Sequence, residues 1–189
     1  MKKIFFSYSF IDKDCAAVFY SILTKYTDCK IYFYDDMLHE KSWQDEVKKA
    51  IKDCDYFVLF MGKQYGRIQE KEVEIFETEN IDSSKSFITV QLLSFDDQKF
   101  SWLPRKRLSV KLKENPAGKP EIFSCVSELA EKCMDLKIRF CDDLPSNPHL
   151  FDYEKTIIDF YITKERLYKL KIDMGIDDTE RPLKKQGGE

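Results

Sequence analysis

The chain has 189 residues, which suits one domain with a short appendage. Its 43% hydrophobic residues, among them 15 phenylalanines, allow a sizeable core. The formal net charge of −3 gives no electrostatic reason to expect nucleic-acid binding, and no run approaches the ~18 apolar residues of a membrane helix. We therefore expect a globular protein whose partners are neither nucleic acid nor membrane.

The cysteine pattern argues against a disulfide scaffold and against a zinc site. No pair of the six cysteines has CxxC spacing, and no histidine lies near one in the sequence. Lys2 and Lys3 precede only a handful of apolar residues, too few for a secretory signal. These patterns predict reduced thiols, no bound metal and a cytoplasmic location.

The first half of the chain alternates short apolar strands with amphipathic helices. The predicted strands cover residues 4–7, 30–34 and 56–61. The first predicted helix covers residues 12–26, with Asp12 or Asp14 as its cap. The second begins after Ser42, which caps it, and it turns Val47, Ala50 and Ile51 inward. Strands that are apolar throughout indicate a parallel sheet covered on both faces.

The second half continues this pattern and then departs from it. The predicted elements are an acidic helix over about 68–80, strands over 87–93 and 108–112, and a helix over 121–136. After residue 140 we expect a connector and an amphipathic helix over 141–178, then a disordered tail over 179–189. The order predicts a parallel sheet with helices on both faces, followed by a helical extension.

Two polar loops follow the first two strands, where open α/β sheets place ligands. The first loop contains Ser7, Ser9 and Phe10, and it leads into a helix N-terminus, which favours a bound phosphate. The alternative is an ordinary turn with an aspartate cap. The second loop contains Asp36 and leads to Trp43, which either packs in the core or stacks on a flat ring of a ligand.

The acidic helix presents two candidate carboxylates. On a helical wheel, Glu72 lies on the same side as Ile68 and Phe76, whereas Glu74 lies nearly opposite. An inward carboxylate requires a partner or a ligand, so Glu72 ranks first and Glu74 second. The alternative for the whole helix is a solvated acidic face.

Taken in order, the segments Lys3–Asp12, Ile31–Asp36, Ser42–Ile51 and Cys54–Tyr65 resemble a Toll/interleukin-1 receptor (TIR) domain of the prokaryotic, NAD-cleaving type. The resemblance implies a flavodoxin-like three-layer fold over residues 1–140. It also implies that Ser7, Ser9, Phe10, Asp36 and Trp43 border a site for NAD, which is a substrate and not a resident cofactor. Family spacing from Tyr65 selects Glu74 as the catalytic residue, and the family tetrapeptide selects Glu72.

Two functions follow from the resemblance. The first is an NAD glycohydrolase or cyclase, which splits the nicotinamide–ribose bond in anti-phage defence or immune signalling. The second is a non-catalytic adaptor that assembles through TIR–TIR contacts. The loop over 35–42 favours the adaptor because it lacks the proline and glycine common in the family. Expected partners are NAD, other TIR copies in an oligomer, and a downstream effector protein. A fragment of a larger signalling ATPase is a third, weaker alternative.

Overall fold

The computed structural model describes residues 1–33, 43–63, 65–80, 84–95, 100, 102–103, 107–114, 116 and 121–138, and for Trp43 only the backbone. The polar loop expected over 35–42 lies outside the described residues. So do the connector, helix and tail expected over 141–189, and with them the proposed domain divisions beyond residue 140.

A five-stranded parallel sheet forms the centre of the fold, with the order β2-β1-β3-β4-β5. The strands are β1 (Lys2–Ser7), β2 (Cys29–Tyr32), β3 (Tyr56–Met61), β4 (Ser86–Gln91) and β5 (Leu108–Lys111). The chain moves outward from β1 to β2 and then crosses to the other side of β1 to form β3. The expected flavodoxin-like α/β fold is therefore confirmed, and the order of its strands reverses between β1 and β3.

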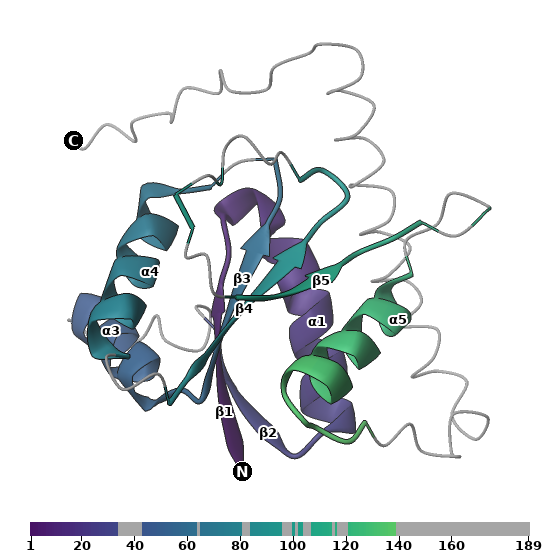
Figure 1. The fold of residues 1–189 in the computed structure, drawn as a ribbon, viewed down its shortest axis with the longest axis horizontal. Helices are drawn as coiled ribbons and strands as arrows, with labels where there is room; N and C mark the ends of the chain where they lie inside the picture. Colours follow the sequence, from purple (N-terminus) through teal and green to yellow (C-terminus); the bar gives the residue numbers. More distant parts are fainter. Residues whose placement is uncertain are drawn as a thin grey trace, which may run out of the picture.

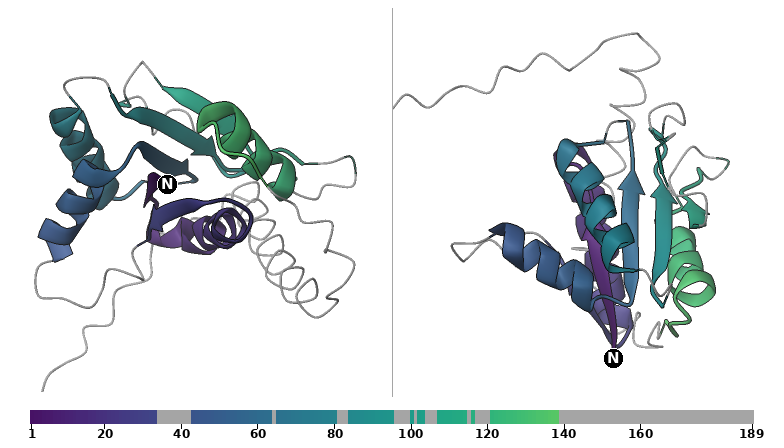
Figure 2. Two further views of the ribbon diagram at one scale, coloured as in Figure 1. Left: turned by 90° about the horizontal axis from the view of Figure 1, so that it is seen from below. Right: turned by 60° about the vertical axis from the view of Figure 1, so that its left-hand side comes forward.

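Helices cover both faces of this sheet (Figure 1). One face carries α1 (Lys13–Tyr26) and α5 (Ile122–Ser127), and the other carries α3 (Trp43–Asp53) and α4 (Arg67–Glu79). The turned view in Figure 2 shows α3 and α4 on one side of the strands and α5 on the opposite side. The inward positions Val47, Ala50 and Ile51 expected for α3 are all buried, and α1 lies within one residue of its predicted range with a buried apolar face.

Alternation along the strands divides the core into two clusters. Ile4 and Phe6 of β1 point toward α1 and α5, whereas Phe5 points toward α3 and α4. On the second face, the rings of Phe5, Phe57 and Phe87 stack in a row across three strands, with centroids 5.3 Å apart at each step. This aromatic row forms the floor beneath α4.

The last helix differs from its predicted form. We expected one helix over 121–136, but α5 ends at Ser127 and a π-helical segment, η3 (Glu128–Cys133), continues it. Asp135 then adopts a left-handed conformation with φ of 51°, and the Leu136 N–H donates to the Ala130 carbonyl at 2.9 Å. The left-handed residue directly after the cap ends the helix before residue 136, and the Leu136 bond reaches one residue further back than the 6→1 bond of a Schellman motif, as a π-helical last turn requires.

The described cysteines are free thiols, and four of the five are buried in the core. Burial raises the pKa of Cys54 and of Cys125 to about 12, so both thiols stay protonated at neutral pH. They therefore pack as small apolar groups.

Candidate active site

The candidate site begins at the carboxyl end of β1, beside the point where the strand order reverses. Ser7 is the last residue of β1, it is fully buried, and its register partner on β3 is Leu59. Ser7 lies on the same face of the sheet as Phe5, which is the face that α4 covers. One step beyond the aromatic row, the sheet thus presents a hydroxyl group to α4.

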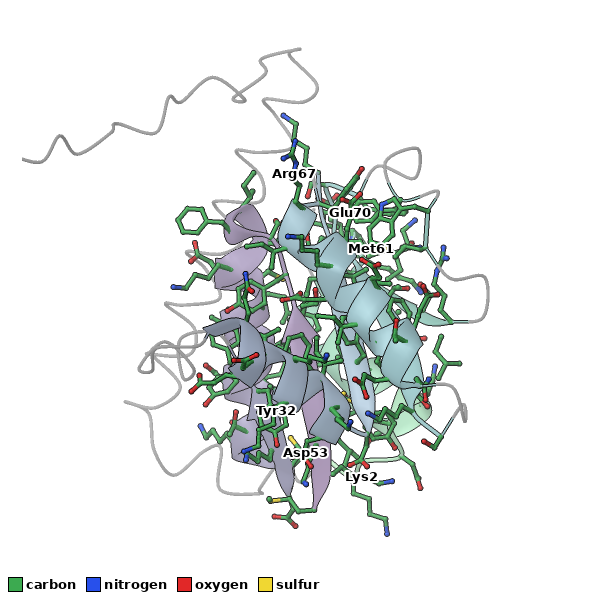
Figure 3. The ribbon with its side chains drawn as sticks, turned by 90° about the vertical axis from the view of Figure 1, so that its left-hand side faces the viewer. Lys2, Tyr32, Asp53, Met61, Arg67 and Glu70 are labelled. Carbon is green, nitrogen blue, oxygen red and sulfur yellow. The ribbon has the colours of Figure 1, made fainter. Side chains whose placement is uncertain are left out.

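The buried side chain of Gln69 anchors the first turn of α4 to the end of β3. Its amide nitrogen donates to the Phe60 carbonyl at 3.2 Å, and its amide oxygen accepts the Gly66 N–H at 2.8 Å. Figure 3 labels Met61 at the end of β3 and Arg67 and Glu70 on the first turn of α4. This connection fixes the helix that carries the acidic residues against the carboxyl edge of the sheet.

Glu72 lies one turn after Gln69, and its side chain is only 1% exposed. The Ser7 hydroxyl donates a hydrogen bond of 2.6 Å to its Oε2 atom. Burial raises the pKa of Glu72 to about 8, and the Ser7 hydrogen bond acts in the opposite direction because it stabilises the charged form. The free protein therefore holds Glu72 mainly in its neutral form at pH 7.

The two oxygens of Glu72 have different surroundings. Oε2 accepts from Ser7, whereas Oε1 is buried and has no hydrogen-bond partner among the described residues. A buried oxygen without a partner costs about 1–3 kcal/mol, so native proteins tolerate few of them. Such an atom at the carboxyl edge of an open α/β sheet indicates a place for a ligand hydroxyl or a water molecule.

The first loop has an internal role that its sequence does not reveal. The Ser9 hydroxyl donates to Oδ2 of the buried Asp12 at 2.6 Å and also accepts the Asp12 N–H at 3.3 Å. The Asp12 carboxylate lies so close to Gly62 that a Cβ atom built there would be 2.2 Å from Oδ1. Asp12 occupies the N-cap position of α1, as one of the two expected caps, but its side chain makes no capping bond. Asp12 instead joins the loops after β1 and β3.

The remaining predicted residues are not gathered at Glu72. Glu74 is exposed, on the outer side of α4, as the helical wheel indicated. The Phe10 side chain is 89% exposed. Asp36 and the Trp43 side chain lie outside the described residues. Ser7 is therefore the predicted binding residue that contacts a predicted carboxylate, and the catalytic and binding roles of all these residues stay predictions.

Sequence inspection missed Gln69 and misplaced Ile68. Gln69 is buried, whereas Ile68 is 49% exposed, although the wheel placed Ile68 inward with Glu72. Figure 3 places Arg67, at the start of α4, at the upper end of the described fold. A glycine followed three residues later by glutamine is a weak capping signal, and it is the one clue to Gln69.

The fold and the site together define a doubly wound α/β domain with a buried carboxyl at its switch point. The family model of the TIR domain matches residues 4–123, well over half of the chain, so the protein belongs to the TIR domain family. This confirms the resemblance to a TIR domain seen in the sequence. No curated protein matches the chain significantly.

Two of the solved structures that match the chain are distant from it. One is the CMP N-glycosidase of Clostridium botulinum, with 17% identity, 50% of this chain and 73% of the other covered, and a TM-score of 0.35. The second is the glutaminase domain of Trypanosoma brucei CTPS, with 13% identity and a TM-score of 0.31. The match covers 62% of this chain and 53% of the other. Similarity at this level carries no argument about chemistry.

Two further findings concern only the part of the chain that the structure describes. No helix there is both long enough and apolar enough to cross a membrane. No three histidine, cysteine or acidic side chains there come together as a set of metal ligands.

Proposed function

We propose that this protein is an NAD glycohydrolase or cyclase that splits the bond between nicotinamide and ribose. The products are nicotinamide and either ADP-ribose or its cyclic form. As a member of the TIR family, it would act in the cytoplasm, in anti-phage defence or immune signalling, and as an oligomer of TIR copies. Glu72 is the proposed catalytic residue, and Ser7 and Ser9 belong to the proposed binding site.

The single observation that carries this proposal is the state of Glu72. Its carboxyl group is buried at the carboxyl edge of the sheet, one of its oxygens accepts from Ser7, and the other has no partner among the described residues. A carboxylate with only a structural role would have both oxygens bonded or exposed to water. Perturbed carboxyl groups in such positions are typical of functional sites.

One carboxylate is sufficient for this reaction. The electron pair of the breaking C1′–N bond goes to the nicotinamide nitrogen, so nicotinamide leaves as a neutral molecule and no general acid is needed. Positive charge develops on the ribose, as in other glycoside cleavages. An ionised Glu72 beside that charge stabilises the transition state. A water molecule then donates an oxygen lone pair to C1′ and releases a proton to solvent, or an adenine nitrogen donates its lone pair to C1′ and the adenine releases a proton.

The raised pKa of Glu72 gives the proposal a pH dependence. The ionised carboxylate is the active form, and in the free protein it becomes the major form only above about pH 8. We therefore expect kcat/KM for NAD cleavage to rise with pH and to level off above that value, because kcat/KM reports the free enzyme. The positive charge of the pyridinium ring favours the ionised form, so kcat should level off at a lower pH than kcat/KM.

The decisive experiment compares nicotinamide release by the wild type, Glu72→Gln and Glu74→Gln. Purified proteins are incubated with NAD over a wide range of protein concentration, and products are identified by mass spectrometry. We expect Glu72→Gln to lose about a hundredfold or more, the size typical of losing a main electrostatic contact to the transition state. Glu74→Gln is the matched control, and it should stay within about twofold because Glu74 is exposed. Equal activity in wild type and Glu72→Gln would contradict the proposal.

The second candidate is a non-catalytic adaptor, and one specific observation favours it. Phe10 exposes 89% of its surface on the loop after β1, which is more typical of a contact with another protein than of a small-molecule site. If wild-type protein releases no nicotinamide at any concentration but associates with itself, and Phe10→Ser prevents that association, the adaptor is the better account.

A further inference from the structure

We propose that Ser7 is a positioning residue for Glu72: its hydroxyl holds Oε2 and thereby keeps the carboxylate turned so that Oε1 is left for the ligand. This inference rests on the proposed function, but its test includes a measurement that does not. In this proposal, Ser7 at the end of β1 orients the Glu72 carboxylate, in addition to any contact that the loop after β1 makes with NAD.

The geometry gives Ser7 a fixed place from which to act. It is paired in register with Leu59 of β3, it is fully buried, and its hydroxyl is 2.6 Å from Oε2 of Glu72. Gln69 fixes the other partner, because it ties the first turn of α4 to the Phe60 carbonyl. The carboxyl group is therefore held between a rigid strand and an anchored helix, which is the arrangement that a preorganised site requires.

A serine hydroxyl suits both protonation states of the carboxyl group. When Glu72 is ionised, the hydroxyl donates to Oε2 in a charge-assisted bond. When Glu72 is neutral, the serine oxygen can accept the carboxyl proton, because a hydroxyl has both a donor and acceptor positions. Glu72 can therefore gain or lose its proton without leaving Oε2 unsatisfied.

The neighbouring charged groups do not offer an equivalent partner. Among the causes that set the pKa of Glu72, burial comes first and Ser7 second, with no contribution from a charged group of the described residues. The other ionisable side chains of α4 and those of α3 occupy partly or fully exposed positions. Asp12, on the loop after β1, is buried against Gly62 and bonded to Ser9.

The test measures the pKa of Glu72 directly, by NMR titration of protein with ¹³C-labelled glutamate carboxyl groups, with Glu72→Gln used to assign the signal. Ser7→Ala should raise this pKa by about one unit, the size expected for losing a hydrogen bond to a charged group. Ser7→Thr keeps a hydroxyl and should stay within about half a unit. If Ser7→Ala does not fold, Ser7→Cys replaces it, and its weak thiol donor should give a smaller rise.

Thr89→Val is the matched control for the loss of a buried hydroxyl. Thr89 lies on β4, is register partner to Leu59, and donates to the Leu108 carbonyl and to Ser109 on the side away from β1. Removing this hydroxyl should cost stability as Ser7→Ala does, but it should leave the titration of Glu72 unchanged.

Enzyme kinetics give the second measurement. For Ser7→Ala, kcat/KM at pH 7 should fall about tenfold, because one pKa unit changes the ionised fraction by that factor, and much of the loss should disappear at pH 9.5. A Glu72 pKa that is the same in wild type and Ser7→Ala would overturn the inference, even if NAD cleavage is established. A raised pKa in a protein that never cleaves NAD would support the inference and contradict the proposed function. A loss of activity that is equal at every pH would mean that Ser7 acts on the substrate instead.

Discussion

The two faces of the sheet use the same strands for different purposes. The face under α1 and α5 is apolar at Ile4 and Phe6 on β1 and from Tyr56 to Phe60 on β3. The face under α3 and α4 begins with the aromatic row of Phe5, Phe57 and Phe87 and then changes, one step later, to Ser7, Leu59 and Thr89. The buried carboxyl of Glu72 lies at this change.

The two faces therefore differ in polarity. The first face packs mainly apolar side chains. The second face accepts the buried polar side chains of Ser7, Thr89, Gln69 and Glu72. Burial of these groups, which also raises the pKa of Glu72, costs free energy that the aromatic row beside them offsets. A buried carboxyl group next to a dense aromatic row is therefore the feature that distinguishes the second face, and the proposed site lies there.

The largest expected effect concerns the pH dependence of stability. The folded protein holds the Glu72 proton more tightly than the unfolded chain, so stability falls as pH rises from 4.5 and the loss is complete above about 8. Glutamine does not titrate, so the unfolding free energy of Glu72→Gln should not show this fall. The unfolding free energy of the variant minus that of the wild type should rise by up to about 4–5 kcal/mol from pH 5 to pH 9. Urea unfolding at both pH values measures it. Parallel pH dependence in the two proteins would show that Glu72 is not the buried titrating group.

The next effect compares the two faces directly. Phe57 stacks on Phe5 and Phe87 on the second face, and Phe60 contacts Phe6 and Phe19 on the first, with ring centroids 5.0–5.3 Å apart in each case. Phe57→Ala and Phe60→Ala should each cost about 4 kcal/mol, because both rings are fully buried. Chemical denaturation measures both losses. A much smaller loss for Phe57→Ala would mean that the aromatic row does not support the second face.

A smaller effect tests the contact between the loops at the carboxyl edge. A methyl group at Gly62 would meet the Asp12 carboxylate at 2.2 Å, and that carboxylate is buried and held by Ser9, so it cannot move aside cheaply. We expect Gly62→Ala to cost about 2–3 kcal/mol in the free energy of unfolding.

Gly66→Ala is the control for Gly62→Ala. The nearest atom to an added Cβ there is the Ile68 nitrogen at 3.9 Å, so the change should cost less than about 1 kcal/mol. Equal losses at both glycines would remove the evidence that Asp12 joins the two loops.

The smallest effect lies on the first face. The Tyr56 hydroxyl donates to the Met134 carbonyl at 2.7 Å and connects the start of β3 to the end of η3. Tyr56→Phe keeps the ring and removes this bond, so it should cost about 1 kcal/mol in thermal or urea unfolding. It should leave the titration of Glu72 unchanged, whereas a shift in that titration would show that the two faces are coupled.

Much of the fold could be predicted from periodicity, because core positions repeat along the chain. The strand expected over 56–61 has those bounds in the structure, and the other strands differ from their predicted bounds by no more than two residues at either end. The inward side of Glu72 followed from the same argument. The burial of Gln69 could not be predicted, since its partners are backbone groups that only the folded chain brings near. The same holds for Asp12, whose carboxylate meets a glycine fifty residues away.

The edges of the sheet have a consequence for how copies of this protein can meet. The two edge strands, β2 and β5, have four residues each, whereas the three inner strands have six. Each edge carries an exposed lysine, Lys30 on β2 and Lys111 on β5. Short edges with outward lysines resist the growth of a continuous sheet from one molecule to the next. The same edges that protect the domain from amyloid-like aggregation would therefore leave its helices and loops as the surfaces through which copies can assemble.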